Sequence, residues 1–140
     1  MTGWRRGFGP VTVLLALLLA LPVGRAAAGD QRVAVAEADG GVVRALDMLT
    51  GELKDIEIKN GQTKTFRRLV ITMRACRYPV DNPSSDAYAY LIIRDVREIK
   101  PRFEGWMTAA SPALSAMDHP RYDVWVLRCN IPPGKTSSGG

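Results

Sequence analysis

Residues 106–129 hold most of the chain's rare, chemistry-capable side chains: two of its three tryptophans, its only histidine and one of its two cysteines. Four residues in this stretch are of the types that form a nucleophilic relay, in which histidine activates a serine and an aspartate orients the ring: Ser111, Ser115, His119 and Asp123. Neither serine lies in the G-x-S-x-G turn that exposes such a nucleophile. Ser111 precedes a proline and is better placed to cap a helix. The pattern therefore argues against a serine hydrolase.

Acid and base catalysis on a glycan is a second possibility, because such enzymes use two carboxyl groups at a fixed separation. The candidates are Asp47, Glu104, Asp118 and Asp123. Spacing along the chain does not fix their separation, and aspartates more often end strands and cap turns. An enzyme that acts on peptidoglycan or another envelope glycan through acidic residues near 104–123 is therefore kept as the alternative hypothesis.

Metal binding is the third possibility, since His119 follows Asp118. Metal sites usually combine several ligands at regular spacing, and this sequence has a single histidine and no C-x-x-C motif. We expect instead that His119 forms hydrogen bonds across a loop and fixes the turn before Pro120. The sequence predicts no metal and no other cofactor, and a metal-binding envelope protein is the second alternative.

Aromatic side chains offer binding rather than catalysis, because tryptophan and tyrosine are favoured both in cores and at interfaces. Trp125 alternates with Val124 and Val126 and is expected in the core. Trp106 follows Gly105 in a predicted loop and is the better candidate for an exposed contact. The candidate binding surface comprises Trp106, Met107, Asp118 and His119.

The first 28 residues have the three parts of a cleaved secretory signal. Arg5 and Arg6 form a basic start, residues 11–23 are almost entirely apolar, and three alanines occupy positions 26–28. About 13 apolar residues are too few to cross a hydrocarbon core roughly 30 Å thick as a helix. We therefore predict cleavage, no transmembrane anchor in the mature chain, and export to the periplasm, most simply by the general secretory route.

Loss of this segment removes most of the excess positive charge. The chain has 19 Lys+Arg and 14 Asp+Glu, of which Arg5, Arg6 and Arg25 leave with the signal, so the mature protein has a net charge of +2. This weak charge gives little support for nucleic-acid binding, which depends on phosphate neutralisation. We expect an envelope protein or polymer as partner; the sequence leaves the oligomeric state open.

Cys76 and Cys129 are predicted to form a disulfide, because disulfides persist in an oxidising compartment. The bond would close a loop of 53 positions and contribute about 4 kcal/mol by the loop-entropy argument. That contribution is large beside the stability of about 5–15 kcal/mol that is typical of one domain.

Short strands separated by turns account for the remaining pattern. The expected strands are residues 42–46, 54–59, 63–66, 69–76, 88–95 and 122–129. Thr50–Gly51 and Asn60–Gly61 are turn or hairpin signals, and residues 113–118 are expected to form a short helix after Ser111 that ends at Pro120.

The predicted architecture is mostly β: a small antiparallel β-sandwich or open barrel over residues 42–129, with one short helix and one disulfide. Apolar residues on both faces of 122–129 predict a central, buried strand. Residues 29–41 are expected to be a flexible lead-in, and residues 130–140 a disordered tail.

Several motifs together resemble one family. They are Phe103-Glu104-Gly105-Trp106-Met107, Ser111-Pro112-Ala113-Leu114, His119-Pro120-Arg121-Tyr122-Asp123-Val124-Trp125, Arg44-Ala45-Leu46-Asp47 with Thr50-Gly51, and Phe66 with Leu69 and Cys76. This pattern resembles the secreted, mainly alphaproteobacterial proteins grouped as domain of unknown function 2155, over about residues 42–129. Met48 and Thr108 depart from it where a lysine and an aromatic residue are common. The resemblance implies an exported envelope protein, and it supplies no catalytic residue.

The leading hypothesis from the sequence is therefore a non-catalytic periplasmic binding or scaffold module of the cell envelope. Its partner would contact the region of residues 106–120 or an exposed strand edge.

Overall fold

The computed structural model describes residues 32–135, together with the isolated positions 2, 3, 7, 9, 24 and 29. The predicted signal over residues 1–28 lies almost wholly outside the described residues, as do residues 136–140 of the predicted tail. Within the described part, no helix is long and apolar enough to cross a membrane.

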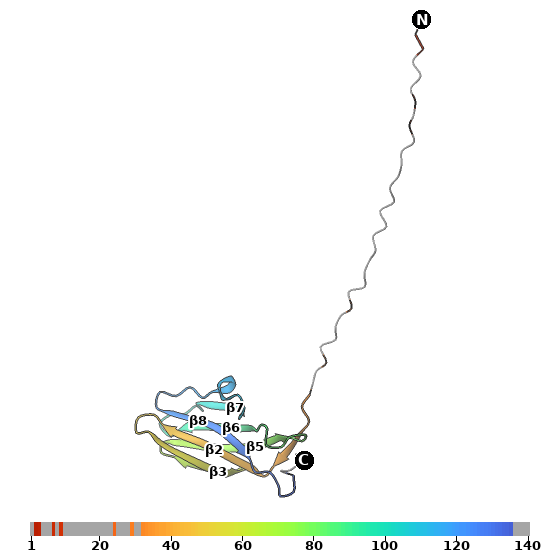
Figure 1. The fold of residues 1–140 in the computed structure, drawn as a ribbon. Helices are drawn as coiled ribbons and strands as arrows, with labels where there is room; N and C mark the ends of the chain where they lie inside the picture. The colour runs from red at the N-terminus through yellow and green to blue at the C-terminus, as the bar shows by residue number, and fades with distance from the viewer. Residues whose placement is uncertain are drawn as a thin grey trace. The chain divides into compact units, whose positions relative to one another are not determined.

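Two antiparallel sheets make up the fold (Figure 1). The five-stranded sheet has the order β1-β5-β6-β7, with β4 also paired to β5; its strands are β1 (Val35–Ala38), β4 (Thr63–Phe66), β5 (Leu69–Pro79), β6 (Tyr88–Asp95) and β7 (Phe103–Thr108). The three-stranded sheet has the order β3-β2-β8; its strands are β2 (Gly40–Asp47), β3 (Glu52–Lys59) and β8 (Tyr122–Cys129). The predicted mostly β, antiparallel architecture is confirmed.

One core lies between the two sheets, because alternate residues of each strand point inward. The five-stranded sheet contributes buried side chains that include Leu69, Ile71, Met73, Leu91 and Ile93, and the three-stranded sheet contributes Val43, Ala45, Ile58, Val124 and Val126. The sequence alternation over residues 54–59 and 69–73 correctly predicted which side chains of these two strands share the buried face.

The turns follow from residues that tolerate positive φ. Gly51 has φ 75° in the β2–β3 hairpin, and Gly61 has φ 79° after β3. The predicted turn at Asn60–Gly61 is present, but it does not close a hairpin. It carries the chain from the three-stranded sheet to β4 in the five-stranded sheet.

The predicted flexible lead-in over residues 29–41 is wrong from Val35 onward. Residues 35–38 form β1, which pairs with the end of β5 in the register Val35↔Pro79 to Ala38↔Cys76. Ala38 enters the core, and Asn60 donates a hydrogen bond from Nδ2 to its carbonyl oxygen at 2.8 Å. The segment looked like a linker because it is rich in alanine and glycine, yet its small residues suit close backbone packing.

Asn130 and Ile131, which follow β8, are held against the rest of the domain. The backbone N–H of Asn130 donates to the carbonyl oxygen of Gly40 at 2.9 Å, and its side chain donates to Glu57. Ile131 packs against the core. The predicted disordered tail over residues 130–140 is therefore wrong for these two positions: Asn130 adds one backbone hydrogen bond to β2 after the end of β8, and Ile131 packs inward.

Two further predictions need correction. The helix expected over residues 113–118 is a single 3-10 turn, η1 (Pro112–Ser115), and Ser111 makes no side-chain cap hydrogen bond there.

Residues 122–129 form an edge strand and not a central one, because β2 occupies the middle of the three-stranded sheet. Apolar residues on both faces of β8 suggested burial on both faces, but Trp125 on its outer face is only partly buried.

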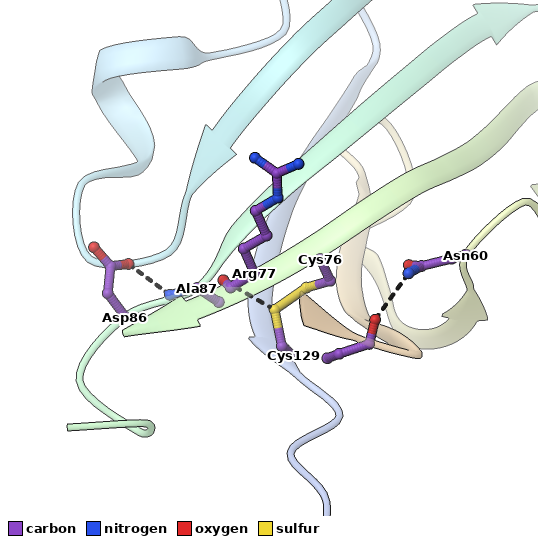
Figure 2. Close-up of a disulfide and its surroundings, with 7 residues drawn as sticks. Asn60, Cys76, Arg77, Asp86, Ala87 and Cys129 are labelled. Atoms are coloured by element: carbon purple, nitrogen blue, oxygen red, sulfur yellow. Dashed lines mark hydrogen bonds between the residues drawn. A yellow bond between two sulfur atoms is a disulfide. The ribbon is translucent and has the colours of Figure 1, made fainter. Parts of the chain in front are cut away.

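Cys76 and Cys129 form the predicted disulfide, which joins β5 in one sheet to β8 in the other (Figure 2). Two β-bulges make this possible. The β5–β6 register skips Arg74, and the β2–β8 register skips Leu127. A bulge shifts the alternation by one residue, so both cysteines point into the core, whereas strict alternation would place them outside.

Gly40 and Gly41 allow the strands to meet beside this bond. A Cβ atom on Gly41 would lie 2.6 Å from the carbonyl oxygen of Arg128 and 2.8 Å from the sulfur of Cys76. A Cβ atom on Gly40 would lie 2.4 Å from the carbonyl oxygen of Ile58. A larger residue at Gly40 would therefore clash with the neighbouring strand β3, and one at Gly41 would clash with β8 and with the disulfide.

Replacing both cysteines with alanine should lower the free energy of unfolding by about 4 kcal/mol, because the loop between them is no longer closed in the unfolded chain. Urea denaturation of the mature chain measures this loss. The intact mass of the parent protein, with and without reductant, provides the control and should differ by two hydrogens. A loss below about 1 kcal/mol would show that the bond contributes little to stability.

Candidate functional site

Trp106 lies on β7 and not in the predicted loop, with its side chain on the outer face of the five-stranded sheet. It is 38% exposed. Tyr90, its partner on β6, meets the indole edge-to-face with ring centroids 5.4 Å apart. The guanidinium of Arg77 on β5 lies 4.8 Å from the indole centroid. These contacts hold an exposed tryptophan in one orientation.

A shallow groove extends from Trp106 across the sheet. It has a volume of about 300 Å³ and is lined by Val33, Val35, Arg77, Tyr88 and Trp106. Asp86 and burial of the ring raise the pKa of Tyr88, burial being the larger effect. We call this surface the Trp106 groove. Sequence reasoning identified Trp106 but missed the other four residues, because strands far apart in the chain bring them together.

The other predicted surface residues do not join Trp106. Met107 alternates with Trp106 along β7 and is buried in the core, only 2% exposed. Asp118 is exposed, whereas His119 is buried. The predicted four-residue surface is therefore not one surface: Met107 and His119 are inside the protein.

His119 belongs to a buried polar network that links β6 to the start of β8. Its Nδ1 accepts hydrogen bonds from the backbone N–H groups of Arg121 (3.0 Å) and Tyr122 (3.1 Å). Because Nδ1 is an acceptor, the ring hydrogen lies on Nε2 and is donated to Asp95 at 3.1 Å. The predicted role of His119, fixing the turn around Pro120, agrees with these bonds.

Asp95 is the centre of that network. Its carboxylate also accepts hydrogen bonds from the side chain of Arg68 (2.9 Å) and the backbone N–H of Arg97 (3.0 Å). Burial by itself raises the pKa of Asp95, but the hydrogen bonds from Arg97, Arg68 and His119 outweigh it and hold the pKa below its usual range. No local pattern could indicate this site, because Asp95 lies 24 positions before His119.

A second carboxylate is paired nearby on the other sheet. Asp47, at the end of β2, is fully buried and accepts two hydrogen bonds from the guanidinium of Arg121, at 3.0 and 2.7 Å. These bonds lower the pKa of Asp47 to about 2, against the opposing effect of burial. Arg68 and Arg121 both lie against the ring of Tyr122, so the two carboxylate sites share one buried ring.

The side chains of this network are paired with one another. Both nitrogens of His119 are engaged in hydrogen bonds, and its side chain is 1% exposed. Asp47 is paired with Arg121 and does not face solvent. Among the described residues, no three His, Cys, Asp or Glu side chains gather in a way that could hold a metal ion.

A second concave surface lies at the open edge of β8, with a volume of about 410 Å³. Its lining residues are Pro112, Ala113, Ala116, Asp123, Val124 and Trp125. Asp123 accepts a hydrogen bond from the backbone N–H of Val124 at 2.9 Å. The predicted core position of Trp125 is wrong: its side chain forms a wall of this surface.

These features define a disulfide-closed sandwich of two antiparallel sheets with a buried polar network and an exposed aromatic groove. The chain belongs to the family described as "uncharacterized protein conserved in bacteria (DUF2155)", which it matches over residues 41–129. The resemblance predicted from the sequence motifs is therefore confirmed.

A relative in Rickettsia prowazekii (strain Madrid E), named "Uncharacterized protein RP359", is 29% identical over 92 residues. The match covers 64% of this chain and 59% of that protein, so the chain spans about three fifths of the length of this relative. No solved structure matches the chain.

The buried carboxylates predict loss of stability in acid. The pKa of Asp47 falls from 3.8 to about 2 on folding, so its contribution is present above about pH 4 and is lost as the pH falls through about 2. Asp95 acts in the same direction. Urea unfolding of the parent and the Asp47→Asn variant should show a difference in free energy that shrinks between pH 4 and pH 2. A difference that stays constant over this range would contradict the assignment.

Truncation of Met107 should lower the stability of the protein more than truncation of Trp106. Met107→Ala leaves a cavity in the core and should cost about 2–5 kcal/mol. Trp106→Ala removes mainly the contacts with Tyr90 and Arg77, and should cost about 1–2 kcal/mol. Urea denaturation measures both. A larger loss for Trp106 than for Met107 would place the indole in the core.

Proposed function

We propose that this protein is a non-catalytic binding or scaffold module of the cell envelope, exported to the periplasm. The observation that carries the proposal is the exposed indole of Trp106, held in place by Tyr90 and Arg77 over a groove. Interface hot spots are enriched in tryptophan, tyrosine and arginine, and these residue types line the groove together.

Export is supported by the signal-like pattern of residues 1–28 and by the disulfide, since such bonds persist in oxidising compartments. A binding role without catalysis is supported by the closed network around His119 and Asp95. His119, one of the residues that suggested a hydrolase, is buried in this network, which connects the two sheets.

The arrangement also suits a scaffold. The disulfide and the polar network fix the two sheets against each other, so the groove is formed before a ligand arrives. A preformed surface loses less conformational entropy on binding than a flexible loop does. The partner would therefore meet the outer face of the five-stranded sheet and not a mobile segment.

Affinity capture tests this proposal. The mature chain, expressed with an affinity tag and exported, is crosslinked in the intact envelope and purified with its bound material. Trp106→Ala should reduce the captured partner roughly tenfold or more. Trp125→Ala serves as the matched control, because this half-buried tryptophan lies on the other sheet, and it should capture as the parent does.

Equal capture by the Trp106→Ala variant and the parent protein would overturn the proposed placement. Incubation of the parent protein with purified cell-wall material, followed by mass spectrometry, provides a second arm. The appearance of new cleavage products would overturn the non-catalytic role and favour an enzyme acting on the glycan.

A further inference from the structure

The course of the Trp106 groove restricts what it can bind. Its lining residues lie on or next to all four strands in the order β1, β5, β6 and β7: Val35 on β1, Arg77 on β5, Tyr88 on β6 and Trp106 on β7. With strands about 4.8 Å apart, the groove extends roughly 14 Å across the sheet. β1 and β7 are the outer strands of this path, so the groove runs across the strands and not along either edge. A peptide added as an extra strand would lie parallel to an edge, and it would not follow the groove.

The walls of the groove are mainly flat and apolar. Trp106 and Tyr88 present aromatic rings, and Val33 and Val35 form the opposite end, 60% and 41% exposed. Sugar rings have apolar C–H faces that pack on aromatic side chains, while their hydroxyl groups stay at the rim in water. A short oligosaccharide lying across the strands would fit such a groove, because its ring faces would contact the apolar walls and its hydroxyl groups would remain in solvent.

Arg77 favours a ligand that carries a negative charge. Its side chain is exposed, and none of the ion pairs between residues 32 and 135 includes it. Glu37 is its register partner on β1 but forms no ion pair with it among those same residues. Stacked on the indole, the planar guanidinium keeps its N–H donors directed sideways, where they can bind a carboxylate in a bidentate manner.

We propose that the Trp106 groove binds an acidic saccharide, with a sugar ring packed on Trp106 and Tyr88 and a sugar carboxylate paired with Arg77. This inference rests on the proposed binding function and names the chemical class of its ligand.

Calorimetric titration with two disaccharides tests the proposal. The first is N-acetylglucosamine linked to N-acetylmuramic acid, which carries a carboxylate. The second is di-N-acetylchitobiose, which has similar rings and no charge. The parent protein should bind the acidic disaccharide roughly tenfold more tightly than the neutral one.

Matched variants locate the interaction. Arg77→Gln should abolish the preference for the acidic disaccharide while leaving weak binding to both. Arg94→Gln, which removes the same charge from the same sheet outside the groove, should leave the preference unchanged. Trp106→Ala should weaken binding of both disaccharides, and Glu37→Gln should strengthen binding of the acidic one, because a nearby negative charge is removed.

Equal affinity for the two disaccharides, or a preference that survives Arg77→Gln, would overturn the inference. So would a short poly-glutamate peptide that displaces the acidic disaccharide at equal concentration, since the groove would then bind acidic peptides. These failures are distinct from failure of the proposed function. If Trp106→Ala abolishes capture from the envelope but no disaccharide binds, the groove has a different ligand. If capture survives Trp106→Ala, the binding surface itself is misplaced.

Discussion

The contact between the two sheets at Cys76 and Cys129 is the constraint on which the rest of the fold depends. Each cysteine reaches the core only because a bulge precedes it on its strand, at Arg74 on β5 and at Leu127 on β8. Gly41 then has to lie against the cysteine sulfur, where a Cβ atom would find no room. The bond, the bulges and the glycine form one unit, and changing any of them would alter how the sheets face each other.

The opposite ends of the same strands are fixed by charge. Leu69 pairs with Asp95 at the start of β5, and Asp47 pairs with Tyr122 at the start of β8. Here Asp95 is hydrogen-bonded to His119 and Arg68, and Asp47 to Arg121. Paired buried charges give little net stability over apolar residues, but removing one partner is costly. Loss of any one partner from this network would therefore leave a buried charge uncompensated where the two sheets meet.

Local patterns in the sequence were sufficient for six of the eight strands, for the turns at Gly51 and Gly61, and for the cysteine pairing, but β1 was taken as a flexible lead-in and β7 as a loop. They were insufficient wherever an outcome depended on pairing between distant strands. Alternation alone cannot show the bulge at Leu127, and it cannot show that β8 has a neighbour on one side only. For the same reason His119 was assigned to a surface: its partner Asp95 comes from another strand, and nothing near His119 in the sequence indicates burial.

The disulfide at one end of these strands and the buried carboxylate network at the other together explain why the candidate site lies on the outer face of the five-stranded sheet. Histidine, buried aspartates and cysteines, the residue types most used in catalysis, are all committed to holding the sheets in register. The side chains left for a partner are those on the outer face of the five-stranded sheet, which the core does not need. Because both ends of β5 are fixed, by Cys76 at one end and by the Leu69–Asp95 pairing at the other, Arg77 is carried on a strand with little freedom to shift. Under the proposed function, an aromatic groove on such a sheet would bind by shape and charge already in place, and its specificity would depend on the few residues that line it.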